Sequence, residues 1–417
     1  MVLEMKSKNS HPKLLHILSY LECFGLEFRS CIVLFSLLAS SITAQAASPA
    51  DGITFLCTSP VKGKNSHSIT TYLASKGIPS SWLTISSISQ RLNIKIKPSM
   101  QSGSTLGISA DKRFGVSSDF VLLIDPERAA KQVPTVSQKE VLLALLHNGR
   151  STTYKGKDCG LEELKDDVGV RQITVAWAQN VAFRWPDGTP AEWESQYWEE
   201  GTPKAGVNLY DALTDALINS SSYAVGCYTA AKIILAASQL DYYQRIKHNS
   251  KQAQSVYDAL MADNDPLINI EPGQAWYFEQ DYPKENDTIV GKILNMKRGV
   301  APRNFVPGDW LYMLNPDPES YAKTGYEGSN AIYLGMNNFS DYYNDHEHSY
   351  RLEQKMHEVY QWRHGVFSRT RDAKKVVSIP SEKMEILANT PSNGGLILGH
   401  RLVPRPISEG LEQGPSY

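Results

Sequence analysis

The residue of this chain with the clearest capacity for covalent chemistry is Cys227, in the segment YAVGCYTAAKIILAASQL. The apolar residues behind it are spaced at i, i+3, i+4 and i+7, as on the core-facing side of a helix: Ala230, Ile233, Ile234 and Ala237. A thiol in the first turn of a helix meets the positive end of the helix dipole and unpaired backbone N–H groups. Both favour the thiolate, the form that attacks carbonyl carbon. The segment therefore predicts a nucleophile, and the alternative is a small buried hydrophobe.

The segment at residues 29–47, RSCIVLFSLLASSITAQAA, has the pattern of a secretory signal peptide. Arg29 is a basic flank, residues 32–39 are a short apolar core, and residues 44–46 form an A-x-A cleavage pattern. We expect cleavage near Ala46-Ala47 and a periplasmic or secreted mature protein without a membrane span. Residues 1–28 make an overlong leader, which suggests a start codon assigned too far upstream. The alternative is an uncleaved N-terminal anchor.

Export changes the interpretation of the cysteines. Of the five in the chain, Cys23 and Cys31 leave with the signal peptide, and three remain. An odd number leaves one thiol unpaired in an oxidising compartment. The economical assignment is a disulfide between Cys57 and Cys159 with Cys227 free, and other pairings stay open on the sequence alone.

The composition is that of a globular protein. The chain has 417 residues, 41% of them hydrophobic, and a net charge of −2. This length allows two or three domains with a sizeable core. The balanced charge argues against a nucleic-acid-binding surface, so we expect no nucleic-acid partner.

Periodicity predicts several elements around the cysteine. Short alternating runs in SSWLTISSISQRLNIKIKPS are typical of strands. Helices are expected over residues 136–148, 161–180 and 208–219, the first with a capping-type start at Ser137 and Glu140. Further strands are expected at Trp310–Leu314, Ala331–Gly335 and Val359–Phe367. We divide the chain into a signal peptide (1–47), an N-terminal extension or accessory region (48–205), a catalytic domain (206–380) and a C-terminal tail (381–417).

Three motifs follow one another in a recognisable order. They are YAVGCYTAAKIIL around Cys227, GDWLY at residues 308–312 with NP after its strand, and GSNAIYLG at residues 328–335. This series resembles the bacterial spore-type protein-glutamine gamma-glutamyltransferases, compact transglutaminases with an NlpC/P60-like core. The resemblance runs from about residue 211 to 367. It implies an α+β fold with a papain-like cysteine-enzyme core, preceded here by an N-terminal extension.

The resemblance also implies a reaction. The Cys227 thiolate would attack the side-chain carboxamide of a glutamine, ammonia would leave, and a lysine amine would take the acyl group from the thioester. The implied partners are proteins that offer glutamine and lysine side chains. The family needs no calcium, and we expect neither a cofactor nor a metal.

The chain departs from the family at the acid/base positions. The family carries Glu just before its cysteine and Glu at the second position of its GEN motif, where this chain has Gly226 and Ser329. NlpC/P60 peptidases place His at that second position. A serine hydroxyl is no general base near neutral pH. The candidates for the base are His364, expected on the next strand, and Glu327 on the turn before Ser329; Ser329 itself would orient a partner.

A second polar cluster, Asp345-His346-Glu347-His348, carries an H-x-H pattern that zinc sites also use. A solvated loop is the favoured interpretation of this segment.

Three functions therefore remain in view. The first is an exported transglutaminase that forms Gln–Lys isopeptide bonds. The second is a cysteine amidase or peptidase on peptidoglycan stem peptides, in which water resolves the acyl-enzyme. The third is a binding domain on a catalytically decayed core, which the missing family glutamates favour and the retained Cys227 disfavours.

Overall fold

The structure is a computed structural model that describes residues 51–402, apart from residues 150, 200, 262–287, 291–294, 324, 346 and 368–372. The expected signal peptide therefore lies outside the described residues. None of the helices in the described ranges is long and apolar enough to cross a membrane.

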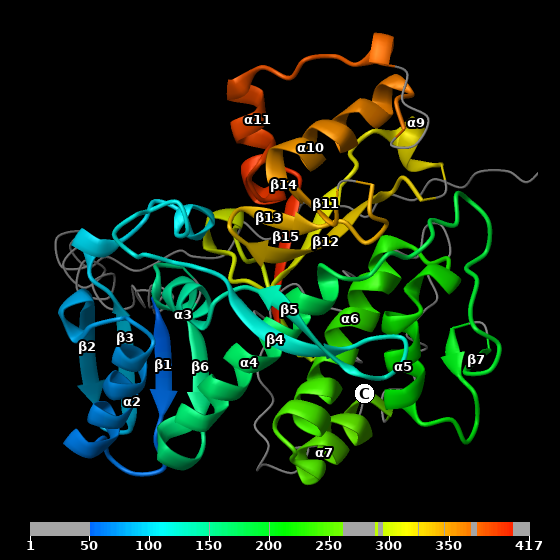
Figure 1. The fold of residues 1–417 in the computed structure, drawn as a ribbon. Helices are drawn as coiled ribbons and strands as arrows, with labels where there is room; N and C mark the ends of the chain where they lie inside the picture. The colour runs from blue at the N-terminus through cyan, green and yellow to red at the C-terminus, as the bar shows by residue number, and fades with distance from the viewer. Residues whose placement is uncertain are drawn as a thin grey trace, which may run out of the picture. The chain divides into compact units, whose positions relative to one another are not determined.

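The N-terminal part of the described chain forms a four-stranded sheet, at the left of Figure 1. Its strands lie in the order β2-β3-β1-β6: β2 (Leu83–Ile88), β3 (Arg91–Ile96), β1 (Ile53–Leu56) and β6 (Thr152–Lys155). Strand β3 buries every second side chain, Leu92, Ile94 and Ile96, as its alternating sequence predicts. The strands expected in this segment are confirmed.

Two helices and a hairpin connect this sheet to the rest of the chain: α3 (Gln138–Leu146), α4 (Leu161–Ala178), β4 (Asp119–Ile124) and β5 (Ala130–Thr135). Helix α2 (Gly63–Ser75) follows β1. Ser137 is the N-cap of α3, and its hydroxyl oxygen accepts a hydrogen bond from the Glu140 N–H at 3.1 Å. The predicted cap and both predicted helices are confirmed.

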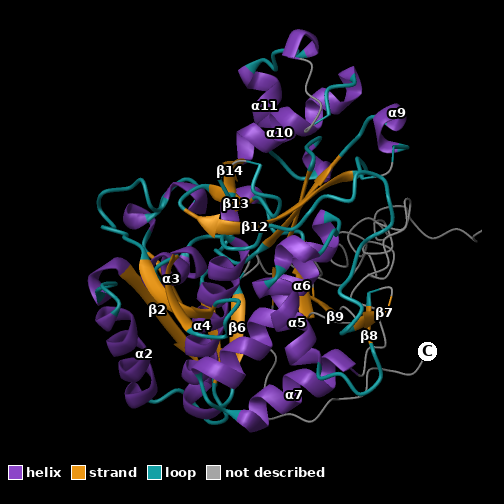
Figure 2. Cartoon of the chain, turned by 45° about the vertical axis from the view of Figure 1, so that its right-hand side comes forward, coloured by secondary structure: helices purple, strands orange, loops and turns teal. Residues whose placement is uncertain are grey.

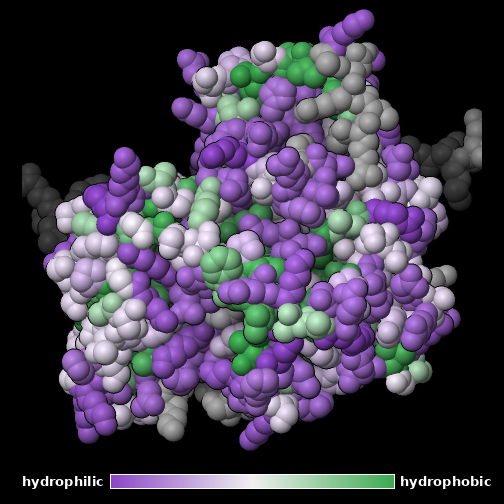
Figure 3. All heavy atoms as spheres, in the orientation of Figure 1, coloured by the Kyte–Doolittle hydropathy of each residue, from purple (hydrophilic) through white to green (hydrophobic). Residues whose placement is uncertain are grey.

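The β4–β5 hairpin exposes apolar side chains on its outer face. Phe120 is 63% exposed and Leu122 47%. Figure 3 shows hydrophobic spheres in the middle of this face, in the region of the hairpin. The inward-facing Leu123 and Val133 are buried, so the hairpin is anchored on one side only.

Three helices follow the hairpin and α4 along the chain: α5 (Leu209–Ile218), α6 (Cys227–Asp241) and α7 (Ser250–Met261). The short strands β7 (Trp198–Glu199) and β8 (Thr202–Pro203) pair just before α5. Helix α6 packs on α4, on α5 and on the large sheet, and Figure 2 shows it below β12 with α5 beside it. The helices expected at 208–219 and after Gly226 are confirmed.

The second sheet has seven strands in the order β14-β13-β12-β11-β15-β10-β9. Their bounds are β9 (Thr288–Val290), β10 (Asn295–Arg298), β11 (Trp310–Leu314), β12 (Gly328–Gly335), β13 (Asn338–Ser340), β14 (Ser349–Arg351) and β15 (Ile397–Leu402). Strands β11 and β12 pair antiparallel, with Trp310 opposite Ile332 and Met313 opposite Ser329. Both strands were expected from the sequence.

The last part of the chain contributes more than a tail. Strand β15 lies inside the sheet, between β11 and β10. Its first residue, Ile397, and the preceding Leu396 are buried in the core beside β11. The sequence shows only a short apolar patch there, because a strand in the middle of a sheet gains its support from neighbours far away in the chain.

Helices α9 (Pro318–Tyr321), α10 (Leu352–Gln361) and α11 (Ser381–Leu387) complete the described elements. The strand expected at Val359–Phe367 is wrong. Residue 359 belongs to α10, which continues into a 3₁₀ turn at Trp362–His364. The reason is the apolar stripe Leu352, Met356 and Val359, which has helical spacing and is buried.

Side chains on the two faces of β11 and β12 belong to different hydrophobic clusters. Trp310 and Ile332 pack in a cluster with α6 and the N-terminal sheet. Leu311 and Met313 point to the other face and pack with α10. The sheet thus lies between α6 and α10, and the first cluster joins residues on both sides of the expected boundary at residue 206.

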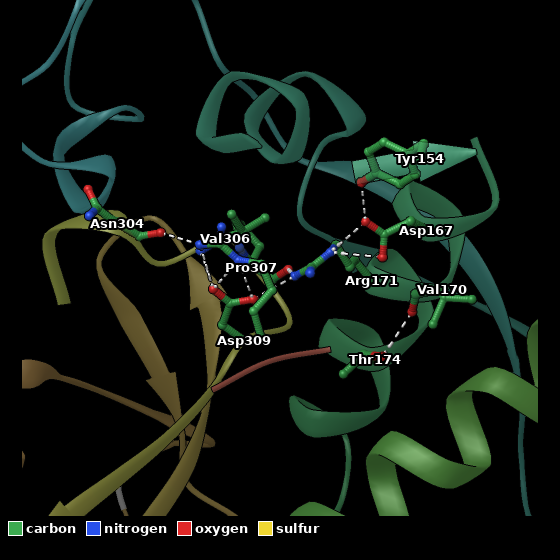
Figure 4. Close-up of polar contacts among 10 residues, drawn as sticks. Tyr154, Asp167, Val170, Arg171, Thr174, Asn304, Val306, Pro307 and Asp309 are labelled. Atoms are coloured by element: carbon green, nitrogen blue, oxygen red, sulfur yellow. Dashed lines mark hydrogen bonds and ion pairs between the residues drawn. The ribbon is translucent and has the colours of Figure 1, made fainter. Parts of the chain in front are cut away.

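A buried charged network ties α4 to the large sheet, as Figure 4 shows for Arg171, Asp167, Tyr154 and Asp309. The Arg171 guanidinium donates to Asp167 at 3.1 Å and to Asp309 at 3.0 Å. Arg401 of β15 donates to the same Asp309 carboxylate at 3.1 Å, and the Tyr154 hydroxyl donates to Asp167 at 2.6 Å. Each buried charge therefore has a charged partner.

Candidate active site

Cys227 is the first residue of α6, as the sequence predicts. Gly226 is the N-cap residue, and the helix behind it is fixed by Ala230, Ile233 and Ile234, all fully buried. Because α6 packs against β12, the start of the helix faces the first residues of that strand. Cys227 itself is half-buried and is the free cysteine of the described residues.

Asn330 of β12 is the direct partner of the thiol. Its backbone N–H donates to Sγ of Cys227 at 3.3 Å, and its side-chain amide Nδ2 donates to the same atom at 3.5 Å. The amide is held in turn by Trp310, whose indole Nε1 donates to Oδ1 of Asn330 at 2.9 Å. Two N–H groups thus converge on the sulfur from one rigid strand.

Asn330 belongs to the GSNAIYLG motif, but the sequence alone did not indicate its role at the thiol. The signal that could have found it is its type, since an amide side chain on a strand that faces the nucleophile offers two donors. Trp310 was likewise noted only as the start of a strand. Its ring also packs against Tyr228, the residue after Cys227, with centroids 5.2 Å apart.

Beside the thiol the structure has a cavity of about 50 Å³. Its walls come from the start of β12, the loop after β13, and α10. They are partly aromatic and partly charged: Trp185, Cys227, Gly325, Tyr326, Gly328, Ser329, Asp341, Tyr343, Asp345, Lys355, Glu358 and Trp362. A pocket of this composition suits an apolar stem with a polar end.

Burial of Cys227 opposes the thiolate that the helix dipole alone would favour. Burial raises the pKa of Cys227, and this effect outweighs the two hydrogen bonds from Asn330, which lower it. The charge of Lys355 also lowers the pKa of the thiol, and the charge of Glu327 raises it. The expectation from sequence omitted the desolvation of a sulfur packed under a sheet.

Two of the predicted site residues lie at or beside this cavity. Ser329 lines it and is 6% exposed. Glu327 directly precedes β12, is half-buried, and accepts a hydrogen bond from the Gly325 N–H at 3.0 Å. Burial raises the pKa of Glu327. Glu327 is not among the residues that line the cavity, but its carboxylate is near enough for its charge to act on the thiol.

His364 is not brought to the cavity. It ends the 3₁₀ turn after α10, stacks edge-on against Tyr360 with centroids 5.9 Å apart, and has a buried Nε2 without a hydrogen-bond partner. Its neighbour Trp362 lines the cavity instead. The His364 side chain is displaced because the segment turns as a helix rather than running on as a strand.

The H-x-H segment can be followed in part, since His346 lies outside the described residues. The ring of His348 contacts the backbone carbonyl oxygen of Val181 at 3.1 Å through Nδ1. Among the residues that the structure describes, no group of three or more His, Cys, Asp or Glu side chains is arranged to hold a metal ion.

The expected disulfide is confirmed. Cys57, at the end of β1, is bonded to Cys159, just before α4. The bond joins two positions 102 residues apart and leaves Cys227 with a free thiol.

The fold and the site together define a class of protein. A cysteine at the start of a helix, packed on an antiparallel sheet in an α+β core, is the papain-like arrangement expected from the sequence. The profile of the protein-glutamine gamma-glutamyltransferase family matches residues 124–356, more than half of the chain. The chain therefore belongs to this transglutaminase family, whose members are acyltransferases that act on protein substrates.

Among solved structures, the chain is similar to the transglutaminase from Geobacillus stearothermophilus without its C-terminal extension. The two are 18% identical, the similarity covers 58% of this chain and 93% of that chain, and the TM-score is 0.36. No curated protein matches the sequence significantly.

The family match begins well before the expected catalytic domain. It starts at residue 124, within the segment assigned to the N-terminal extension, and it ends in α10 at residue 356. The division at residues 205 and 380 stays a prediction.

Proposed function

We propose that this protein is an exported transglutaminase that joins glutamine and lysine side chains through a thioester on Cys227. The observation that carries the proposal is the pair of Asn330 N–H groups directed at the Cys227 sulfur, beside a cavity. N–H donors directed at a thiol sulfur stabilise its charged form, the thiolate. Family membership supplies the reaction class.

The chemistry proceeds in two halves. The S–H proton of Cys227 passes to solvent water, the sulfur attacks the carboxamide carbon of a glutamine, and the C–N bond breaks as the nitrogen takes a proton from solvent and leaves as ammonia. The neutral lysine amine then attacks the thioester, the C–S bond breaks, the amine proton passes to solvent, and the cysteine sulfur takes up a proton from solvent. The aromatic walls of the cavity, Trp185, Tyr326 and Tyr343 among them, suit the methylene stem of a glutamine or a lysine.

A hydrolase is less well supported by the site. The amidase alternative calls for a histidine base next to the thiol, and the described residues that line the cavity include no histidine. The residue at the corresponding strand position is Ser329, which lines the cavity and is buried.

Export is part of the proposal. The Cys57–Cys159 disulfide supports it, because disulfides persist in oxidising compartments and are rare in the cytosol of mesophiles. Terminal sequencing of the protein recovered from cell fractions tests this part: a new N-terminus near Ser48 in the periplasm or medium is expected. An intact N-terminus in the cytoplasm contradicts it.

The reaction is tested by incorporation of a fluorescent primary amine into a glutamine-rich acceptor protein by the full chain. We expect incorporation that Cys227→Ala abolishes. Release of ammonia without amine incorporation identifies a hydrolase instead. If the folded, disulfide-bonded chain neither incorporates the amine nor releases ammonia, the enzyme proposal is overturned in favour of a binding protein.

A further inference from the structure

The cavity lacks the acid/base group that the family motif would supply. Position 329 is a serine, and the predicted substitute His364 lies elsewhere. The charged residues that do line the cavity are Lys355 and Glu358 of α10 and two carboxylates of the loop after β13. Lys355 is the basic residue among these lining groups. Among the described residues that line the cavity, Lys355 is therefore the candidate for stabilising a thiolate by a positive charge.

Helix α10 holds Lys355 in place. The buried stripe of α10 fixes the helix against the sheet, so Lys355 and Glu358, three residues apart, share its cavity-facing side. Nζ of Lys355 lies 3.1 Å from Oε1 of Glu358, with 16% and 5% of the two side chains exposed. The ammonium also lies 5.1 Å from the ring centroid of Tyr350. A cation held this way in a largely buried site acts through little screening solvent.

The other described ionisable groups around the sulfur supply no positive charge, so Lys355 is the group among them that favours the thiolate. Those at the cavity or close behind it are Glu327, Asp341, Tyr342, Tyr343, Asp345, Tyr350 and Glu358. These are acids, and Glu327 raises the pKa of the Cys227 thiol, whereas Lys355 lowers it. Lys232, on α6 itself, lies over the ring of Tyr228, 5.0 Å from its centroid.

We propose that Lys355 of α10 is the electrostatic partner of the Cys227 thiolate, with Glu358 as the residue that positions Lys355. The S–H bond of Cys227 breaks, its proton passes to solvent water, and the Lys355 ammonium stabilises the sulfur charge that remains. Lys355 is unchanged by this step. The inference rests on the proposed function in that it takes Cys227 as the nucleophile.

The test is the pH dependence of alkylation of Cys227 by iodoacetamide, because only the thiolate reacts. The full chain is used, and the rate is followed at the Cys227 peptide by mass spectrometry. Lys355→Gln keeps a hydrogen-bond donor for Glu358 and removes the charge. We expect the alkylation rate at pH 7 to fall about tenfold, because loss of the positive charge raises the pKa of the Cys227 thiol. Lys355→Arg, which keeps the charge, is expected to stay within about twofold of the wild type.

A matched variant gives the opposite sign. Glu327→Gln removes the charge that raises the pKa of Cys227, so its alkylation at pH 7 is expected to be about twofold to threefold faster. Glu358→Gln frees Lys355 from its anchor and is expected to slow alkylation, less than Lys355→Gln does. Retention of the Cys57–Cys159 disulfide and of the thermal unfolding midpoint shows that each variant is folded.

The outcomes separate this inference from the proposed function. An unchanged alkylation profile in folded Lys355→Gln overturns the inference, and so does a Lys355→Arg variant as slow as Lys355→Gln. Alkylation that is slower in Lys355→Gln but not in Lys355→Arg supports the inference. This holds even if the wild-type chain transfers no amine, because alkylation does not depend on substrate turnover.

Discussion

Arg171 and Lys355 are both basic residues on helices that pack against the large sheet, but their surroundings differ. Arg171 is 1% exposed and is enclosed by the carboxylates of Asp167 and Asp309. Lys355 is paired with Glu358 on one side and lines a cavity with a free thiol on the other. The charged network of Arg171 joins α4 to the large sheet. The Lys355–Glu358 pair instead places a positive charge at the cavity beside the thiol. Removing a charge should therefore cost stability at Arg171 and thiol reactivity at Lys355.

The largest expected effect on stability is at the closed network. Arg171→Met leaves Asp167 and Asp309 with one cation fewer in a site without solvent. We expect the free energy of unfolding to fall by about 3–5 kcal/mol, the usual consequence of breaking a buried ion pair. Urea denaturation measures it. Lys165→Met, on the exposed side of the same helix where Lys165 pairs with Glu162, is the control and should cost less than about 1 kcal/mol.

A loss below about 1 kcal/mol in Arg171→Met would mean that the network is dispensable. A changed rate of Cys227 alkylation in an Arg171→Met variant that stays folded would instead show that the Arg171 network and the cavity are coupled. The comparison predicts neither result.

A second buried acid sharpens the comparison, because it has no charged partner among the described residues. Glu140 of α3 is 1% exposed; Oε1 accepts from the Met336 N–H at 2.8 Å, and Oε2 has no hydrogen-bond partner. Burial raises the pKa of Glu140 to about 7. A carboxyl whose pKa is raised on folding stabilises the folded state while protonated, and this contribution is lost as the pH rises towards and through 7.

We therefore expect the wild type to lose about 2–3 kcal/mol of stability between pH 5 and pH 8 through Glu140 alone. Glu140→Gln keeps the acceptor for Met336 and should remove this part of the pH dependence. Urea unfolding at several pH values measures the difference, with Glu353→Gln on the exposed face of α10 as the control. Parallel pH profiles for the wild type and Glu140→Gln would contradict the assignment.

The smallest expected effect is at the thiol's hydrogen bonds. Asn330→Ala removes the Nδ2–H donor but keeps the backbone N–H, so we expect about fivefold slower alkylation of Cys227 at pH 7. Asn330→Asp keeps an acceptor for Trp310 and places a carboxylate at the sulfur, and should be slower still. Faster alkylation in Asn330→Asp would be incompatible with an Asn330 amide that stabilises the thiolate.

The parts that could be predicted from sequence are those with a local signal. The nucleophile's helix, the strands β11 and β12 and the cap at Ser137 depend on spacing within a few residues. In these cases the pattern and the structural element cover the same short stretch of chain. The Cys57–Cys159 pairing is different: the odd count of cysteines favoured it without excluding other pairings, and the bond joins positions 102 residues apart.

The parts that could not be predicted depend on residues far apart in the sequence. Arg171 and Asp309 meet across 138 positions, and Lys355 lines the same cavity as the thiol only because α10 packs on the sheet that α6 also covers. The segment before His364 was expected to be a strand because residues 359–367 show no helical spacing by themselves. The helical stripe begins earlier, at Leu352. The raised pKa of Cys227 comes from burial, which the sequence does not display.

The most direct test of the central claim is to look for the thioester itself. The full chain is incubated with a glutamine-bearing peptide in the absence of any amine, quenched in acid, and analysed by mass spectrometry. The account predicts an adduct of the peptide less ammonia on Cys227, which hydroxylamine removes and which Cys227→Ser does not form as a thioester. Ammonia released by the wild type and the Cys227→Ser variant alike, with no adduct on either, would contradict the account.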